Sequence, residues 1–533
     1  MARRGAWAGA LMFACLIGTG SALAQGGFGR RQPEIVLRDA RIVTMAGEPI
    51  EGGTIVLQGN VIRQIGKEVP AGDNARVIDA KGWTITPGLI DVDGALGMTV
   101  SSARGNVSPA DAMNRAIDSF DRYDTRGFKE AVRNGVTAVY ISPRSGGGIT
   151  GMGSVVRLEP GNGPWAGKAA LEEAALCIDM GSGDRPIQRL ATFDRVRKQL
   201  RGALDYREAL ETYKEELADY EKKVKERAEK EGGGTKPTKP EEKKDDQPAP
   251  GPKPEETPKT TVAEGEGAWD GSGADPAQPD PRPRRGPRGG PRGEGPPAPG
   301  AGSPPSAPSG GGNSNDELKK PAEPSRDARS EVILKALDRE VPVRVRAQRS
   351  EDILNAIDLA REFNLRLIID GGAESYLVGR ELKRAEAPVV LGPAIGRDVF
   401  VNDELARRRA DAPAMLSESR VDWVVGSGAI GARDSGAASR FILLNAQATV
   451  QGAGREAKDP LRLVTADAAD FLGVSETCGR LRVGMPADVV VWTGDPLDPG
   501  SRVAMVYVGG ELVYQAEEAA AREGAGAGEG GDR

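Results

Sequence analysis

Thr86-Pro-Gly-Leu-Ile-Asp-Val-Asp-Gly-Ala95 is the stretch of this 533-residue sequence that decides the fold. It reads as a strand that follows a Pro-Gly turn and ends among carboxylates. Successive side chains of a strand point to opposite faces, so Asp91, Asp93 and Ala95 share one face. We therefore expect this strand to present acidic side chains on one face near its end.

Short strands separated by turns lie on both sides of this stretch. Residues 34–79 contain β-branched runs broken by Gly, Asn and Pro, and Ala487–Trp492 and Val503–Val508 have the same character. The middle of the chain alternates strand-like and helix-like segments, namely Val136–Ile141, Val343–Arg346, Ser350–Phe363 and Leu365–Ile369. That alternation predicts a parallel β/α domain.

Two motifs resemble the amidohydrolase superfamily. Residues 86–95 are similar to its Pro-Gly-Leu-Ile-Asp-x-His-x-His strand. Residues 479–499 are similar to its closing signature, here Gly-Arg-Leu-Arg-Val-Gly-Met-Pro-Ala-Asp-Val-Val-Val-Trp followed by Gly-Asp-Pro-Leu-Asp-Pro. The stretch 343–376 resembles the imidazolonepropionase-related branch in particular. The resemblance covers about 34–220 and 330–514.

The resemblance implies an α/β architecture with two folded parts. A small composite β-sandwich is expected from 34–85 and 479–514, at the two ends of the chain. A (β/α)8 barrel of the amidohydrolase type is expected from 86–230 and 329–478. Residues 515–533 are expected to form a flexible tail.

Amidohydrolases hold one or two divalent metals, zinc among them, at the carboxyl-terminal mouth of the barrel. The metal lowers the pKa of a bound water and polarises the substrate carbonyl. In the family the ligands are the His-x-His pair, a His on each of strands five and six, and an Asp on strand eight. These positions fall here on Asp93, Ala95, Arg346, Gly371 and Gly428. The sequence contains no histidine, and of these five only Asp93 offers an oxygen ligand.

These substitutions predict a charged pocket with no metal, no cofactor and no assigned catalytic residue. Arg346 would place a permanent cation where the metal stands in the family. Asp93 could meet it as an ion pair, because a buried charge is tolerable only when it is paired. The pocket is expected to comprise Asp93, Ala95, Arg346, Gln348, Asp370, Gly371, Ser427 and Gly428. Two interpretations stay open: the pair fills the cavity, or it binds an anionic or polar ligand.

Three functions follow from different features of the chain. The first is an exported pseudoenzyme of the amidohydrolase family, which binds a small molecule or assembles. The second is an imidazolonepropionase-like hydrolase of carbon–nitrogen, non-peptide bonds, which works through carboxylates such as Asp93, Asp370 or Glu374. The third makes the long helix and the insert the functional parts. The lack of histidine excludes a His-dependent triad, a His-ligated zinc site and a haem with a proximal His.

Residues 1–24 predict a secretory signal peptide. Arg3 and Arg4 precede an apolar stretch, and Ala22 and Ala24 form an Ala-x-Ala cleavage site. About 15 apolar residues is short for a membrane span. The mature protein is therefore expected to be periplasmic or extracellular, with no membrane span after cleavage.

Residues 231–328 predict a disordered insert. Proline and glycine occupy more than a third of it, so it cannot bury enough apolar surface to fold. Its basic run 281–292 gives weak support for nucleic-acid binding, and we favour a solvated spacer. Residues 191–230 predict a long helix whose 3.5-residue apolar repeat indicates a coiled coil or a packing stripe. Homo-oligomers are common among such barrels, which is an analogy only.

Two further features bear on chemistry. Cys177 and Cys478 are the cysteines left after cleavage, and their spacing does not decide whether they form a disulfide. The glycine-rich stretch 145–153 lacks the Gly-Lys-Ser/Thr ending of a P-loop. It therefore predicts a loop at the barrel mouth.

Overall fold

The computed structural model describes residues 34–72, 74–98, 111–143, 147–160, 167–180, 186–231, 318–394, 405–428, 438–454 and 458–520. The chain divides into two compact units, one of Met1–Tyr213 with Glu323–Arg533 and one of Lys214–Ala322. The expected signal peptide, residues 232–317 of the expected insert and residues 521–533 of the expected tail lie outside the described residues.

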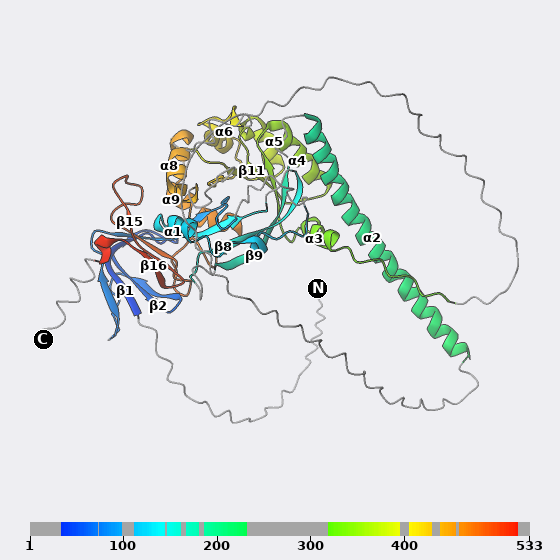
Figure 1. The fold of residues 1–533 in the computed structure, drawn as a ribbon, viewed down its shortest axis with the longest axis horizontal. Helices are drawn as coiled ribbons and strands as arrows, with labels where there is room; N and C mark the ends of the chain where they lie inside the picture. The colour runs from blue at the N-terminus through cyan, green and yellow to red at the C-terminus, as the bar shows by residue number, and fades with distance from the viewer. Residues whose placement is uncertain are drawn as a thin grey trace, which may run out of the picture. The chain divides into compact units, whose positions relative to one another are not determined.

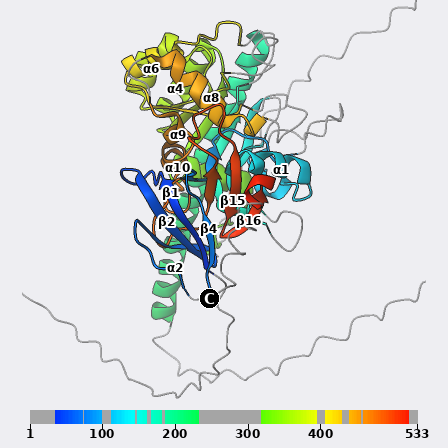
Figure 2. The ribbon, with the colours of Figure 1, turned by 90° about the vertical axis from the view of Figure 1, so that its left-hand side faces the viewer.

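Strands from both ends of the chain form one eight-stranded sheet (Figures 1 and 2). They are β1 (Glu34–Ile42), β2 (Ile50–Gln58), β3 (Val61–Gly66), β4 (Arg76–Asp79), β5 (Thr84–Pro87), β14 (Val489–Trp492), β15 (Val503–Val508) and β16 (Glu511–Gln515). The two ends meet where β5 pairs antiparallel with β14, with Thr86 opposite Val490. The expected two-layered sandwich is not confirmed, because hydrogen bonds link all eight strands into a single sheet.

The second sheet has eight strands that follow one another in chain order. They are β6 (Leu89–Asp91), β7 (Val136–Ile141), β8 (Gly148–Arg157), β9 (Lys168–Asp179), β10 (Val343–Ala347), β11 (Leu367–Gly371), β12 (Val389–Leu391) and β13 (Trp423–Val425). Strands β9 to β13 run parallel, as do β6 and β7. This order makes β10, β11 and β13 the fifth, sixth and eighth strands, in agreement with the numbering used for the ligand positions.

Strand β8 breaks the expected (β/α)8 alternation, because it runs antiparallel to both β7 and β9. The connection between β7 and β8 is six residues, too short for the crossover helix that parallel strands require. The expected loop at 145–153 is therefore wrong from Gly148 onward, where β8 begins. Its glycines serve packing: a Cβ on Gly153 would come within 2.1 Å of the Tyr140 hydroxyl.

The barrel-like sheet is nearly closed by side-chain and loop contacts between its first and last strands. The backbone N–H of Ser427, just after β13, donates to Asp91 Oδ1 at 2.9 Å. The N–H of Gly428 donates to the carbonyl of Asp93 at 3.1 Å. Asp91 Oδ2 also accepts from Ser439 Oγ at 2.6 Å. Within the described residues these bonds take the place of a ladder between β6 and β13.

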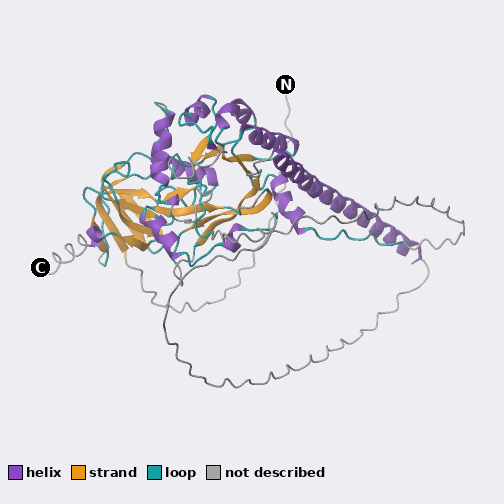
Figure 3. Cartoon of the chain, turned by 45° about the horizontal axis from the view of Figure 1, so that its top comes forward, coloured by secondary structure: helices purple, strands orange, loops and turns teal. Residues whose placement is uncertain are grey.

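Helices cover the outside of this second sheet (Figure 3). They are α1 (Thr125–Arg133), α3 (Ala328–Leu337), α4 (Ser350–Glu362), α5 (Gly379–Arg384), α6 (Ala412–Glu418), α8 (Ile442–Ala453), α9 (Pro460–Leu463) and α10 (Ala466–Leu472), with 3₁₀ turns η1 (Ala116–Ser119) and η3 (Ser375–Val378). In α4 the apolar residues Ile353, Ala356, Ile357 and Ala360 recur at helical spacing, and all four are buried in the main core.

The long helix expected at 191–230 is confirmed as α2 (Pro186–Glu231). Its amino-terminal half belongs to the first unit, where Val196, Leu200 and Ala203 are buried in the main core. In the second unit, Leu217 and Tyr220 keep the apolar stripe half-buried. None of the helices in the described parts of the chain is long and apolar enough to cross a membrane.

Candidate functional site

The candidate site lies inside the barrel, where β6, β10 and β11 bring charged side chains together. Alternation along β10 places Arg344 and Arg346 on the same face, two residues apart. Both face the interior, and their partners come from the end of β6 and from β11. The result is two layers of charge, an outer one at the carboxyl-terminal mouth and an inner one below it.

The outer layer is the expected ion pair. Arg346 Nη2 lies 3.1 Å from Asp93 Oδ1, and the side chains are 18% and 4% exposed. Within the described residues this is the only hydrogen bond of the Arg346 guanidinium. Burial lowers the pKa of Arg346. The negative charges of Asp93, Asp370 and Asp179 raise it by more, so the pKa lies above its usual value. Arg346 is therefore a fixed cation with donors to spare at the mouth.

The inner layer is centred on Arg344, which is fully buried. Its Nε and Nη2 donate to the carboxylate of Asp370 at 2.6–3.0 Å, and Nη2 also donates to the carbonyl of Val92 at 2.9 Å. The guanidinium carbon lies 3.7 Å from the centre of the Tyr140 ring, in a cation–π contact. The Tyr140 hydroxyl in turn lies 3.1 Å from the thiol of Cys177.

The metal that the family resemblance implies does not fit the residues at the corresponding positions of this chain. Gly371 has φ +94°, and a Cβ there would come within 2.1 Å of the Gln348 amide nitrogen. Gly428 has φ +56°, and a Cβ there would come within 2.4 Å of Pro393. Ala95 is buried and offers no ligand atom. In the part of the chain that the structure describes, no cluster of three or more His, Cys, Asp or Glu residues could hold a metal.

Two further pocket residues, and the Glu374 carboxylate of the hydrolase alternative, have structural partners. Gln348 Oε1 accepts from the N–H of Ala373 at 3.2 Å. Ser427 Oγ donates to the carbonyl of Asp93 at 3.3 Å, so this serine helps close the barrel. Glu374 Oε2 accepts from both the N–H and the hydroxyl of Ser350 at the start of α4.

Sequence reasoning missed the inner layer. The alternation of side chains along 343–346 puts Arg344 on the same face as Arg346, but it indicates no partner for Arg344 and no role for Tyr140 or Cys177. Both sit in apolar runs that read simply as strands. Only the strand order and register, which the sequence pattern does not contain, show that they face Arg344.

A cavity of about 540 Å³ adjoins Gly371 at the same end of the barrel. It lies beside the ends of β11 and β12, with Ala373, Leu391 and Gly392 among its lining residues. Arg408 also lines it and donates to the carbonyls of Pro393 and Gly392. Burial lowers the pKa of Arg408, and no carboxylate in the described residues pairs with it. The mouth therefore also holds the guanidinium of Arg408, whose charge no carboxylate of the described residues balances.

Comparisons with known proteins show which family the fold resembles. Residues 349–513 match the model of the amidohydrolase family. An amidohydrolase from Thermotoga maritima MSB8 has a similar structure, with a TM-score of 0.59, 21% identity, and coverage of 90% of this chain and 100% of that chain. No curated protein matches the sequence.

Two other solved structures are less similar to this chain. A Xaa-Pro dipeptidase with bound methionine in its active site is 15% identical, with a TM-score of 0.44 over 91% of this chain and 100% of that one. An adenosine deaminase from Xanthomonas campestris with bound zinc is 13% identical, with a TM-score of 0.43 over 94% and 98%. The family match and the Thermotoga structure together show an amidohydrolase-type fold in this chain.

Proposed function

We propose that this protein binds a small anionic ligand at the carboxyl-terminal mouth of its barrel and does not carry out metal-dependent hydrolysis. The observation that carries the proposal is the ion pair between Arg346 and Asp93. It puts a guanidinium at a position where the family has a metal ligand. A fixed cation at that point disfavours a divalent ion and attracts an anion.

The free donors of Arg346 support an anionic ligand. Only Nη2 is engaged, by one oxygen of Asp93, and the side chain is partly exposed. A guanidinium presents its donors in a planar fork that matches a carboxylate or a phosphate. Arg408 supplies a second cation at the same end of the strands, beside the cavity next to Gly371. A ligand of one or two carboxylates suits such a site.

A second candidate is a hydrolase of carbon–nitrogen, non-peptide bonds, similar to the imidazolonepropionase branch. The family match over 349–513 and the resemblance of 343–376 favour it. The carboxylates it would use are already engaged: Asp370 by Arg344, and Glu374 by Ser350. Asp93 is the remaining one, and it pairs with Arg346. The geometry therefore favours binding over hydrolysis.

Export is part of the same proposal and rests on residues 1–24. The positive start, the apolar stretch and the Ala-x-Ala site support cleavage after Ala24. Amino-terminal sequencing of the mature protein from a fractionated host should give Gln25 as its first residue. A protein that keeps Met1 in the cytosolic fraction would contradict export and leave the binding site proposal unaffected.

The binding proposal is tested with untagged protein and three probes: succinate, succinamide and imidazolonepropionate. We expect succinate to bind in a calorimetric titration, and succinamide, which lacks the charge, to bind far more weakly. Arg346→Gln should weaken succinate binding about tenfold or more, since it removes a charge-assisted contact. Arg38→Gln, an exposed arginine on β1, is the matched control and should leave binding unchanged.

Two results would overturn the proposal. One is hydrolysis of imidazolonepropionate that is lost on chelation and restored by zinc, because this is the behaviour of a metal enzyme. The other is succinate binding that is equally strong in Arg346→Gln and in the unmodified protein.

A further inference from the structure

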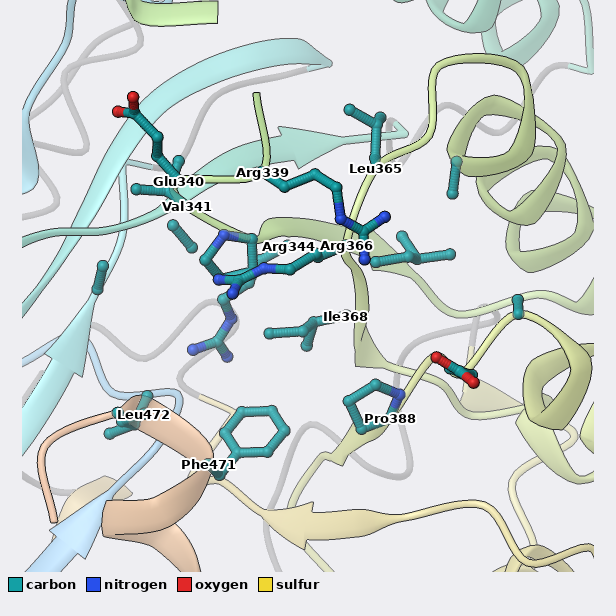
Figure 4. A pocket seen from close by; sticks show the side chains of 18 of the residues that line it. Arg339, Glu340, Val341, Arg344, Leu365, Arg366, Ile368, Pro388, Phe471 and Leu472 are labelled. Carbon is teal, nitrogen blue, oxygen red and sulfur yellow. The ribbon is translucent and has the colours of Figure 1, made fainter. Parts of the chain in front are cut away.

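A second cavity opens at the other end of the barrel, where β10, β11 and β12 begin. Its volume is about 830 Å³, and its lining includes residues just before each of these strands, Pro342, Arg366 and Pro388 among them (Figure 4). The charged mouth described above lies at the opposite ends of the same strands. The two cavities therefore share the barrel but not their openings.

Arg344 and Tyr140 line the inner end of this cavity, and both are fully buried. Two nitrogens of the Arg344 guanidinium bind Asp370 and Val92, whereas Nη1 is buried and has no hydrogen-bond partner among the described residues. A buried donor without an acceptor has lost its hydrogen bonds to water and gained none from the protein, which is unfavourable. The inner end of the cavity thus contains a guanidinium nitrogen that lacks an oxygen partner.

Arg366 adds a cation without an ion pair in the described residues. It lies just before β11, and alternation puts it on the same face as Ile368 and Asp370, which is the face that lines the barrel interior. Figure 4 shows the side chains of Arg366 and Arg344 among those that surround the cavity. Arg366 forms no ion pair with any residue that the structure describes, and neither does Arg384, which also lines the opening.

The acidic residues of the opening only partly balance these cations. Glu173 pairs with Lys335 at 2.5 Å, and Asp470 pairs with Arg480 at 2.6 Å. Glu340 and Glu386 also line the cavity and have no ion pair in the described structure. Arg366 and the two free glutamates are exposed at the opening, whereas Arg344 is buried at the inner end of the cavity.

An apolar wall faces these arginines. In Figure 4, Phe471 and Leu472 lie on the side of the cavity across from Arg339, and Ile368 lies between them. The Phe471 ring centre is 5.9 Å from the Arg344 guanidinium carbon. The cavity therefore offers cationic donors at one side and an apolar surface at the other.

We propose that this cavity at the amino-terminal ends of β10–β12 binds a small organic carboxylate with an apolar body. The carboxylate lies between Arg366 and Arg344 Nη1, and the body packs against Ile368 and Phe471. A carboxylate has two oxygens, which suffice for both donors. Typical ligand sites have this composition, an apolar lining with a few convergent polar groups. The proposal is independent of the ligand at the opposite mouth.

The test is a calorimetric and NMR titration of the full-length protein with four probes: benzoate, phenylacetate, phenylacetamide and inorganic phosphate. We expect at least one of the two aromatic carboxylates to bind, and the uncharged amide and the phosphate to bind more weakly. Arg366→Glu should weaken carboxylate binding about tenfold or more. Arg38→Glu carries the same change of charge on β1 and should have no effect.

A second variant tests the cavity itself. Ile368→Trp should abolish binding because the larger side chain fills the cavity, although every arginine is kept. Circular dichroism checks that this variant is folded. Arg346→Gln, which alters only the opposite mouth, should leave carboxylate binding here unchanged. The proposal is overturned if neither aromatic carboxylate binds in an Arg366-dependent way, if phosphate binds as tightly as they do, or if folded Ile368→Trp binds them normally.

Discussion

Arg344 binds Asp370 diagonally across two neighbouring strands. In the register of β10 and β11, Asp370 stands opposite Arg346, yet its carboxylate accepts from Nε and Nη2 of Arg344, two residues earlier. Arg346 is thereby left to pair with Asp93 at the end of β6. Each of the two interior arginines thus has a carboxylate of its own, which is the condition for burying both.

The two pairs should differ in their contribution to stability. Arg344→Met leaves the buried carboxylate of Asp370 without its ion-pair partner, so we expect it to lower the free energy of unfolding by about 3–5 kcal/mol. Arg346→Met should cost less, because its pair is partly exposed and solvent can take over some of the interaction. Urea unfolding of both variants measures the difference. A larger loss in Arg346→Met would mean that the outer pair holds the barrel together.

Much of this arrangement could be predicted from the sequence, but not all of it. The residue types at positions 93 and 346 and the alternation of strand side chains were enough to predict that ion pair. The partner of Arg344 depends on a diagonal contact, which requires the register. The antiparallel strand β8 was missed because its glycines read as a loop, whereas they permit close packing against Tyr140 and the backbone of Asn114.

Asp91 should make stability depend on pH. Burial raises the pKa of this carboxyl above its usual value, against the opposing hydrogen bonds from Ser427 and Ser439. The stability that the protonated Asp91 contributes is therefore fully present below the unfolded pKa of about 4, and it is lost as the pH rises through the folded pKa.

The test compares the unmodified protein with Asp91→Asn. The asparagine keeps an oxygen for the Ser427 N–H but cannot ionise. The difference in free energy of unfolding between the two proteins should shift in favour of the variant as pH rises from about 4. Other acids titrate in both proteins and cancel. A difference that does not change with pH would show that Asp91 has an ordinary pKa.

The two cysteines in the described residues should resist modification in the native protein. Cys177 and Cys478 are both free and buried. Burial raises the pKa of Cys177 to about 11 and that of Cys478 to about 12, so neither is a thiolate at neutral pH. A thiol reagent should label both only after denaturation. Rapid labelling under native conditions would show that the barrel opens locally.

Removal of residues 232–317 should leave the folded units intact. That stretch is rich in proline and glycine, so it has little apolar surface with which to stabilise anything else. A variant in which a short Gly/Ser linker joins Glu231 to Leu318 should keep a Tm close to that of the full chain, by differential scanning calorimetry. A clear drop in Tm would mean that the deleted residues pack on the rest of the protein.

The former metal positions should resist restoration. Gly371→His must place a side chain at φ +94° and within 2.1 Å of the Gln348 amide. The backbone alone should cost about 1–3 kcal/mol, and Gln348 must also move. Gly47→His is the matched control, because nothing lies within 4 Å of a Cβ at that glycine, and it should be nearly neutral by urea unfolding.

The same reasoning extends to a protein with all five family ligands, histidine at 93, 95, 346 and 371 and aspartate at 428. All five are needed before hydrolysis could return, but they are not sufficient. Gly428 has φ +56° and abuts Pro393, so an aspartate there is strained as well. Loss of Arg346 also removes one of the two positive charges that favour the ionised form of Asp370. We expect this variant to unfold more readily than the parent and to hold less than one zinc per chain by elemental analysis. A stable variant with stoichiometric zinc would show that the backbone at these five positions can still hold metal ligands in the right geometry.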